Sequence, residues 1–552
     1  MKRIPRIALF IAGIAVTIGK LQIALSRYFD PDEFSHLQWA YTIFQGKLPY
    51  KDFFYGYTPL FQWILAPWFF LPEGSYFMPL FRVIMFLFTG IITILLYDIT
   101  KKIVHNKTLA LFAPLTYLLF PIILDKTIEI RPDTPMLLFF LLAVWLLQNK
   151  KPRVLLSGLS FGISLLFLPK IFYAIIPLLY LTWSYRKKIT DIWMFCCGTA
   201  LAGMAFLLYF LITGTLSNAY EAIVTGSMTL FFGLHYSVFE VLKPWPLVYL
   251  AGGGGLPWVV STGIWIIGLL GAGTFALKNK RMGLFLLLFI GSGSLYLIVN
   301  PFTMTQYLMP IAAIASIGVP LFFSMLSELF PQHKQDVLNI VYILIPLLLL
   351  LSFSMQYRER INKTSWNEQR QVLDVVHTVI PKNEPVYDMI GSFMYRQTSF
   401  PYMSVAYAIF IDTFNPFHTT LTQSLINTQT KYIILDQKGY VFWKPKQEDL
   451  TFILNNYVLS PWFKVYVPGV SFSCTTGVCT QYNVKNEPIT QTTTINLPIH
   501  GSYELITAPT NQTVTINGVP MKHGDIQQLS TTMYEFTVSP LLRSFTLRWH
   551  NL

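Results

Sequence analysis

Long runs of apolar residues recur along this chain and constrain its fold more than any other feature. A helix that crosses a membrane needs about 20 consecutive, mainly apolar residues. Runs near that length, several of them short, lie at 7–26, 79–97, 108–124, 134–148, 154–168, 171–185, 190–213, 256–277, 282–299, 305–326 and 337–355. Because 53% of the residues are hydrophobic and the mean hydropathy is +0.49, we expect a polytopic α-helical membrane protein with about eleven transmembrane helices.

The basic residues between these runs predict how the chain is oriented. The net charge of +13 comes mainly from short clusters at 2–6, 101–107, 150–153, 186–188 and 278–281. Every cluster falls in an alternate loop, and the positive-inside rule makes those loops cytoplasmic. We therefore expect an integral protein of the cytoplasmic membrane with its amino terminus inside and its carboxyl terminus outside. We interpret the charge as orientation and contact with membrane lipids, not as nucleic-acid binding. The first run lacks a clear cleavage site, so we expect it to be a retained helix.

The composition changes after residue 355, where apolar runs shorten to the length of strands. We expect a transmembrane catalytic domain at 1–355 and an extracytoplasmic domain at 356–552. Helical spacing over 366–380 and strand-like runs at 385–390 and 431–435 predict an α/β part at 356–465. Short alternating runs predict a β part at 466–552. Cys474 and Cys479 fall on the expected oxidising side with four residues between them, so we expect a small disulfide loop.

The segment at 29–57 concentrates acidic residues directly after the first apolar run. Only 12% of the chain is charged, yet Asp30, Asp32 and Glu33 occur within four residues, and Asp52 follows. Carboxylates beside a membrane edge repel one another and are costly to desolvate, so a cationic, protonated or hydrogen-bonding partner should meet them. The segment is a candidate functional site. The alternative is a polar loop whose acids face water.

His36 raises the question of a metal. It lies one helical turn after Asp32 and Glu33, so it could share a metal ion with Glu33 or orient Asp32. One histidine and one glutamate are too few to establish a metal site. We expect no certain cofactor, and a divalent metal ion stays open.

Three short motifs in this segment carry a family resemblance. The sequence reads PDE at 31–33, GKLPYKDFF at 46–54 and TPL at 58–60. This pattern resembles the first outer loop of the GT-C glycosyltransferases of the dolichyl-phosphate-mannose protein mannosyltransferase and aminoarabinose transferase type. The next outer loop reads EIRPD at 129–133, which is similar to the E-x-R-P-D signature of many bacterial members. The architecture resembles the family over 7–355, although the motifs cover only the first third.

The resemblance implies a specific chemistry. Its donor is a sugar linked to a polyprenyl phosphate, and the sugar is transferred on the extracytoplasmic face with inversion at the anomeric carbon. The catalytic aspartate of the family carries over to Asp32, and Glu33 matches the second acid of the motif. Some relatives bind a divalent ion in this region and others do not.

The residue types fit that chemistry on their own terms. Glycosyl transfer by single displacement needs a carboxylate that takes a proton from the acceptor and cations that steady the departing phosphate. Asp32 is the candidate base, and basic side chains expected on the same outer side could hold the phosphate. The candidate substrate-binding residues are Lys47, Lys51, Asp52, Arg131, Asp133, Lys170, Gln306 and Tyr307.

Each of these candidates has a plainer alternative. A lysine near a membrane often only extends its ammonium to the membrane surface. Asp133 could simply cap a helix that starts beside Pro132. Gln306 and Tyr307 match the family loosely, so packing is an equally simple role.

We therefore expect a membrane glycosyltransferase that uses a polyprenyl-phosphate sugar and an envelope glycan, lipid or protein as acceptor. The alternative is a flippase or transporter of lipid-linked glycans. Transporters usually show internal repeats and ionisable groups near the middle of the bilayer. This chain keeps its acids in outer loops and shows no obvious repeat. A receptor or scaffold would leave the acidic motifs without a purpose.

Overall fold

The computed structural model describes residues 4–149, 151–233, 255–300, 304–363, 365–403, 415–434, 446–530 and 533–550. The chain divides into two compact units, which we call unit 1 and unit 2. Unit 1 consists of Met1–Phe29, Tyr57–Phe61 and Tyr76–Trp366. Unit 2 consists of Asp30–Gly56, Gln62–Ser75 and Asn367–Leu552. The acidic segment after the first helix therefore belongs to the same compact unit as the carboxyl-terminal part of the chain.

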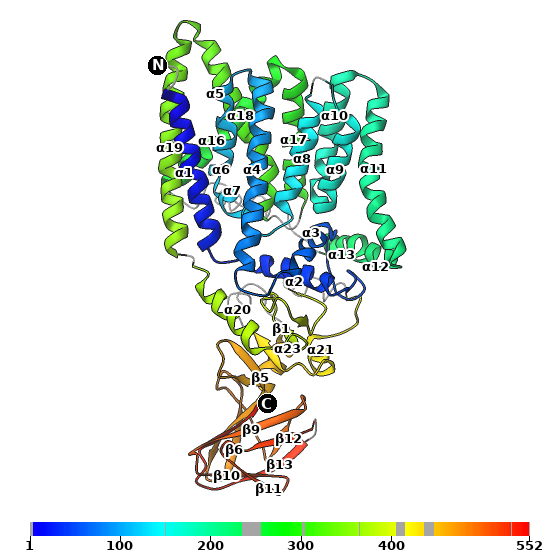
Figure 1. The fold of residues 1–552 in the computed structure, drawn as a ribbon, viewed down its shortest axis with the longest axis vertical. Coiled ribbons are helices and arrows are strands. Elements are labelled where there is room, and N and C mark those ends of the chain that lie inside the picture. Colours follow the sequence, from blue (N-terminus) through cyan, green and yellow to red (C-terminus); the bar gives the residue numbers. More distant parts are fainter. Residues whose placement is uncertain are drawn as a thin grey trace. The chain divides into compact units, whose positions relative to one another are not determined.

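Unit 1 is built from helices (Figure 1). The longer ones are α1 (Ile4–Ser26), α4 (Phe77–Val104), α8 (Asp133–Leu147), α9 (Val154–Phe167), α10 (Ile175–Arg186), α11 (Ile189–Ile212), α16 (Gly255–Lys278), α17 (Lys280–Val299), α18 (Met309–Leu329) and α19 (Lys334–Lys363). The shorter ones are α5 (Lys107–Ala110), α6 (Phe112–Leu119), α7 (Pro121–Lys126), η2 (Pro169–Ala174), α12 (Leu216–Tyr220), the π-helical turn η3 (Glu221–Thr225), α13 (Gly226–Gly233), η4 (Thr305–Leu308) and η5 (Pro331–His333). A run of four glycines at 252–255 ends the long loop between two expected spans, and its residues 252–254 lie outside the described residues.

Within the described part of the chain, seven segments are long and apolar enough to cross a membrane. They are Leu9–Ser26, Phe77–Val104, Ile189–Ile212, Gly255–Lys278, Lys280–Val299, Gln306–Leu329 and Leu338–Asn362. The other four expected runs, at 108–124, 134–148, 154–168 and 171–185, fall on shorter helices. The prediction of a polytopic helical membrane protein is confirmed, and length and apolar character alone identify seven of the eleven expected spans.

The expected span at 108–124 is interrupted for a local reason. Pro121 is the first residue of α7, and Phe120 before it has extended backbone angles. Proline lacks an N–H and disfavours helical angles in the residue before it, so α6 ends at this point. The run is divided into α5, α6 and α7.

Glycines let several helices of unit 1 approach closely. A Cβ atom at Gly158 of α9 would lie 2.0 Å from the carbonyl oxygen of Phe195, and one at Gly198 of α11 would lie 2.2 Å from that of Leu155. Gly158 and Gly162 form a G-x-x-x-G pattern, which allows backbones to pack tightly in a membrane. The same closeness recurs between α16 and α18, where a Cβ at Gly271 would lie 1.9 Å from the carbonyl oxygen of Gly318.

Unit 2 contains helices from both ends of the chain and all of the named strands. Its helices are α2 (Pro31–Phe44), η1 (Ala66–Phe70), α20 (Asn367–Val379), α21 (Leu421–Asn427) and α23 (Gln447–Asn456), while α3 (Leu60–Leu65) crosses the boundary. Its strands are β1 (Pro385–Tyr387), β2 (Gln397–Thr398), β3 (Tyr432–Ile434), β4 (Tyr457–Leu459), β5 (Val465–Thr475), β6 (Val478–Tyr482), β7 (Pro488–Gln491), β8 (Thr494–Asn496), β9 (Gly501–Ala508), β10 (Thr513–Ile516), β11 (Val519–Lys522), β12 (Ile526–Leu529), β13 (Met533–Val538) and β14 (Ser544–Trp549).

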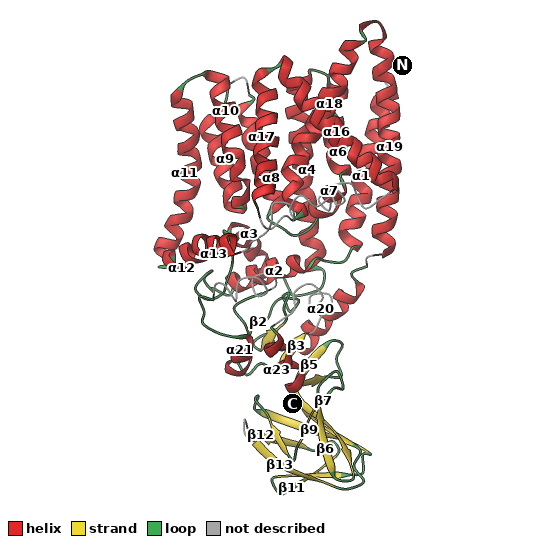
Figure 2. Ribbon diagram, turned by 180° about the vertical axis from the view of Figure 1, so that it is seen from behind, coloured by secondary structure: helices red, strands yellow, loops and turns green. Residues whose placement is uncertain are grey.

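The strands form two sheets, which Figure 2 shows in yellow. One has ten strands and contains the order β12-β9-β14-β5-β3-β1-β2, and the other has four in the order β11-β10-β13-β8. β1 lies parallel to β2 and β3. The long strand β5 pairs with β3 near its start and with β14 further along, so it joins the α/β part to the β part.

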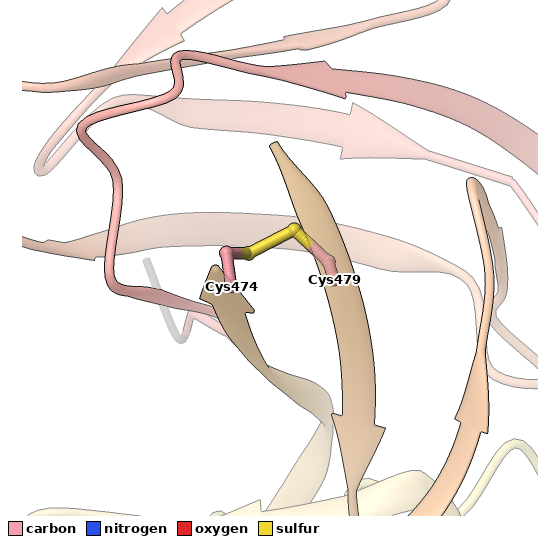
Figure 3. The surroundings of a disulfide bond; sticks show 2 residues. All are labelled: Cys474 and Cys479. Atoms are coloured by element: carbon pink, nitrogen blue, oxygen red, sulfur yellow. A yellow bond between two sulfur atoms is a disulfide. The ribbon is translucent and has the colours of Figure 1, made fainter. Parts of the chain in front are cut away.

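The predicted elements of the carboxyl-terminal part are confirmed. The helix expected over 366–380 is α20, and the strands expected at 385–390 and 431–435 correspond to β1 and β3, with residue 435 outside the described residues. The predicted disulfide is also present. Cys474 and Cys479 are bonded across the facing ends of β5 and β6 (Figure 3).

Candidate active site

The acidic residues that open α2 have distinct surroundings. Asp30 is the N-cap, and its carboxylate accepts a hydrogen bond from the N–H of Asp32 at 3.1 Å. The carboxylate of Glu33 accepts a hydrogen bond from the N–H of Asp30 at 2.8 Å, which completes a capping box. Glu33 is fully buried, whereas Asp32 is only half-buried. The capping box gives Asp30 and Glu33 a role in starting the helix and leaves Asp32 as the partly exposed carboxylate of the pair.

His36 is buried on the same helix and is held by an amide. Its Nδ1 lies 2.8 Å from Nε2 of Gln62. An amide nitrogen can only donate, so Nδ1 accepts, and a neutral ring carries its proton on Nε2. The residues that the structure describes include no group of three or more His, Cys, Asp or Glu that could hold a metal ion. This surrounding does not fit the metal-ion alternative, and we derive no step through a metal.

The loop after α2 is shaped by turns. The N–H of Leu48 donates to the carboxylate of Asp52 at 2.7 Å, and the N–H of Asp52 donates to the carbonyl of Leu48 at 2.9 Å. Lys47 and Lys51 are exposed on this loop. Phe54 is buried and its N–H donates to the carbonyl of Pro401 at 2.8 Å, still within unit 2. Asp52 therefore closes the turn that presents the two lysines.

Arg131, Asp133, Lys170 and Tyr307 come together within unit 1. Lys170 donates a hydrogen bond to the carboxylate of Asp133, and Nε of Arg131 lies 3.6 Å from the other oxygen of that carboxylate. The ammonium of Lys170 also lies 4.2 Å from the centre of the Tyr307 ring. Asp133 is the first residue of α8, and no side-chain hydrogen bond caps that helix at Pro132. The carboxylate of Asp133 thus pairs with two cations at the start of α8.

Burial affects the charge of Lys170. Desolvation lowers the pKa of its ammonium, and the carboxylate of Asp133 opposes that shift. An additional anion beside this group would favour the charged form further. Gln306 lies next to Tyr307 and is largely buried, at 9% exposure, whereas residues 301–303 before it are outside the described part of the chain.

A larger ion network surrounds the EIRPD motif in unit 1. Glu129 is fully buried, and its carboxylate accepts hydrogen bonds from Arg27 at 3.1 Å and from Lys126 at 2.8 Å. Asp125 accepts two hydrogen bonds from Arg360, each of 2.6 Å. Ion pairs of up to 3.7 Å connect the cations Arg27, Lys126, Arg131, Lys170 and Arg360 with the carboxylates Asp125, Glu129 and Asp133. A gathering of cationic side chains of this kind suits an anion.

Arg82 holds the end of α1 beside this network. Its side chain is fully buried and donates to the carbonyls of Ala24, Arg27 and Tyr28 at 3.1, 2.7 and 2.7 Å. The guanidinium also lies 3.7 Å from the centre of the Phe29 ring. It therefore fixes the backbone that carries Arg27.

The sequence alone did not single out Arg27, Arg82, Asp125, Lys126 or Arg360. Arg27 directly follows the first apolar run, and Asp125 and Lys126 follow the third, so charge at a membrane edge was the available signal. Arg360 lies 235 residues after its partner Asp125, and no local pattern connects them.

Comparison with known proteins shows which family part of this chain resembles. Residues 57–212 match the family model described as dolichyl-phosphate-mannose-protein mannosyltransferase. This part of the chain is similar to that glycosyltransferase family. The resemblance seen in the sequence motifs is thereby confirmed.

Individual relatives agree with the family match. The chain is 31% identical over 188 residues to GPI mannosyltransferase 1 of Kluyveromyces lactis, which is 34% of this chain and 45% of that protein. It is also 31% identical over 159 residues to GPI mannosyltransferase 1 of Saccharomyces cerevisiae, which is 28% of this chain and 35% of that protein. The matched stretch thus spans less than half the length of these relatives.

The fold resembles solved structures over most of the chain. ArnT from Cupriavidus metallidurans, solved bound to undecaprenyl phosphate, matches with a TM-score of 0.53 and 11% sequence identity. The match covers 82% of this chain and 96% of ArnT, and the apo form of ArnT matches equally. The chain described here therefore has the ArnT fold.

Proposed function

We propose that this protein transfers one sugar from a polyprenyl-phosphate donor to an acceptor in the cell envelope. The family match and the likeness of its fold to a structure that holds undecaprenyl phosphate support a lipid phosphate as the carrier. The observation that carries the proposal is the ion network of unit 1, which gathers the cations Arg27, Lys126, Arg131, Lys170 and Arg360. Such a network is suited to the phosphate of a lipid carrier.

The bond changes follow from the chemistry of the donor. A hydroxyl or amine of the acceptor attacks the anomeric carbon, the bond from that carbon to the phosphate oxygen breaks, and the electron pair leaves with the phosphate. Arg131 and Lys170 hold the phosphate and stabilise the charge that develops on it. Asp32 accepts the proton of the acceptor. A single displacement of this kind inverts the configuration at the anomeric carbon. The products are the glycosylated acceptor and polyprenyl phosphate.

Asp32 fits the role of base better than its neighbours. Glu33 is fully buried and bonded to the backbone of Asp30, whereas Asp32 keeps partial exposure. A base must reach the proton of an incoming acceptor, so exposure favours Asp32. In this scheme Lys47 and Lys51 contact the head group of a substrate, Asp52 holds their turn, and Gln306 and Tyr307 line the phosphate site.

We also propose an eleven-span topology in the cytoplasmic membrane, with transfer on the outer side. The alternation of basic clusters along the chain supports it. Reporter fusions after residue 150 and after residue 552 test it. A cytoplasmic signal from the carboxyl-terminal fusion would contradict both the topology and the side of transfer.

The base assignment is tested by three variants in the purified full-length protein. Undecaprenyl-phosphate mannose, glucose and aminoarabinose, labelled in the sugar, are offered with envelope fractions as acceptor. Asp32→Asn should lower the rate with the reacting donor by roughly 10²- to 10⁴-fold, while binding of undecaprenyl phosphate changes little.

Two neighbouring variants serve as controls. Asp30→Asn and Glu33→Gln should be mild, because asparagine is a good N-cap and glutamine can complete a capping box. Transfer by Asp32→Asn at nearly the unmodified rate would disprove the assignment. Passage of intact donor across vesicles without cleavage would favour a flippase.

A further inference from the structure

Helix α2 is unusual in being enclosed along most of its length. Ten consecutive residues, from Glu33 to Thr42, are buried. A surface helix normally buries only one face. The position of α2, and of Asp32 in its first turn, therefore depends on what packs around it.

One set of contacts comes from a segment more than 350 residues later, which we call the 388–396 segment. The hydroxyl of Ser35 donates to the carbonyl of Ile390 at 2.9 Å, across 355 residues of sequence. The side-chain amide of Gln38 donates to the carbonyl of Arg396 at 2.8 Å. Between them, a Cβ atom at Gly391 would lie 2.9 Å from Cβ of Gln38, and the φ of Gly391 is +81°. Glycine permits both this backbone angle and this close approach.

The 388–396 segment is itself held from several sides. The N–H and the hydroxyl of Ser392 both donate to the carboxylate of Asp388. Arg396 is 1% exposed and donates to the carbonyl of Ile380 at 2.7 Å. It also pairs with Glu73 at 3.0 Å, in the part of unit 2 that follows η1. Burial raises the pKa of Glu73, but Arg396 lowers it more strongly, so the carboxylate stays ionised and the pair intact at neutral pH.

Aromatic rings complete the enclosure at the other end of α2. The ring of Tyr395 lies 5.6 Å from that of Tyr41 and 5.1 Å from that of Phe69. Its hydroxyl donates to the carbonyl of Leu71 at 3.3 Å. The 388–396 segment thus touches α2 through hydrogen bonds and ring contacts at three of its residues.

We propose that the 388–396 segment is a positioning element for Asp32, with Gln38 and Ser35 as the residues through which it acts. An α-helix is stiff over so short a distance, and Asp32 precedes Gln38 by six residues, or about 9 Å of helix. A side chain that fixes the rotation of α2 at Gln38 therefore also fixes the direction of the Asp32 carboxylate. This inference rests on the proposed role of Asp32, and it gives the carboxyl-terminal part of the chain a share in the chemical step.

The first test measures the position of α2 without any assay of activity. Gln38→Met keeps the volume of the side chain and removes only the hydrogen bond to Arg396. Thr42→Val is the matched control, because Thr42 is buried on the same helix and its hydroxyl bonds to the carbonyl of Gln38 inside the helix at 2.9 Å. Hydrogen–deuterium exchange of the backbone amides of residues 32–37 should speed up several-fold in Gln38→Met and stay near the unmodified rate in Thr42→Val. Equal exchange in the two variants would overturn the proposal.

The second test connects this position to Asp32. Gln38→Met should lower kcat by about 10- to 100-fold, since a misplacement of about 1 Å can cost roughly 10²-fold, while the affinity for undecaprenyl phosphate is kept. In the Asp32→Asn background the same change should have almost no further effect on the residual rate, because the group being positioned is gone. An undiminished effect in that background would show that Gln38 does not act through Asp32.

The two ideas fail in different ways. If Asp32→Asn alone transfers sugar at nearly the unmodified rate, the base assignment is wrong whatever the exchange data show. If Asp32→Asn is impaired but Gln38→Met behaves like Thr42→Val, the positioning proposal is wrong. Should Gln38→Met not fold, Ser35→Ala removes the other hydrogen bond at lower cost, and the same exchange and rate comparisons with Thr42→Val decide.

Discussion

The carboxylate of Asp125 should make the stability of this protein depend on pH in a defined window. Burial raises its pKa, but Arg27 and Arg360 lower it more strongly, from the usual 3.8 to about 2. This lowering of the pKa corresponds to about 2 kcal/mol in favour of the folded state. The side chain keeps 23% of its exposure, so this figure is an upper value.

The sign follows from the lowered pKa. The stabilisation is fully present above pH 3.8, where the unfolded carboxyl is also ionised, and it is lost as the pH falls from about 3.8 to about 2. Roughly half should remain at pH 3. Asp125→Asn removes it at every pH and leaves Arg27 and Arg360 facing each other without the anion.

The assay compares thermal unfolding of the unmodified protein and Asp125→Asn in detergent at pH 7, 5 and 3. The midpoint should fall by a few degrees in the variant at pH 7, and the gap should shrink by about half at pH 3. Asp374→Asn is the control, because Asp374 forms an exposed ion pair with Arg370 that should contribute little. A gap that is the same at pH 7 and pH 3 would refute the reasoning.

Three further outcomes are expected. Lys170→Met should weaken binding of undecaprenyl phosphate by about 10- to 100-fold in native mass spectrometry, since a charged hydrogen bond contributes about 1.5–3 kcal/mol, and unchanged affinity would remove Lys170 from the phosphate site. Gly158→Leu should prevent a monodisperse peak in size-exclusion chromatography, because its Cβ would overlap Phe195, whereas Gly203→Leu points into open space and should elute normally. The cysteines of the disulfide should resist alkylation until a reductant is added, and labelling of the untreated protein would argue against the bond.

Much of the fold followed from the sequence because membranes set the length of apolar runs. α1, α4, α11 and α16 begin and end within a few residues of the expected spans, apart from the longer end of α4. The run at 108–124 failed as a single helix because Pro121 interrupts it. The hydropathy of a segment does not reveal such a break, because it describes side chains, whereas the break arises from a missing backbone hydrogen bond.

The site was less predictable than the fold. The spacing of Asp30 and Glu33 already encoded a capping box, but the family motif drew attention to the same residues for chemistry. The pairs that join Asp125 to Arg360 and Gln38 to Arg396 span 235 and 358 residues. Such pairs form only through tertiary packing, and no periodic or local sequence pattern predicts them.

The contacts between α2 and the 388–396 segment also determine when, during synthesis of the chain, α2 can be fully packed. A ribosome adds about 5–20 residues per second, so the 355 residues that separate Ser35 from Ile390 take roughly 20–70 s to make. During that interval the membrane helices can insert one after another, but α2 still lacks its contacts with the 388–396 segment. A nascent or truncated chain that stops before residue 388 would carry the whole cation network and still lack the contacts that orient its proposed base. Under the proposed function, such a chain would bind donor lipid but hardly consume it, and catalysis would begin only after the 388–396 segment has been made and packed against α2.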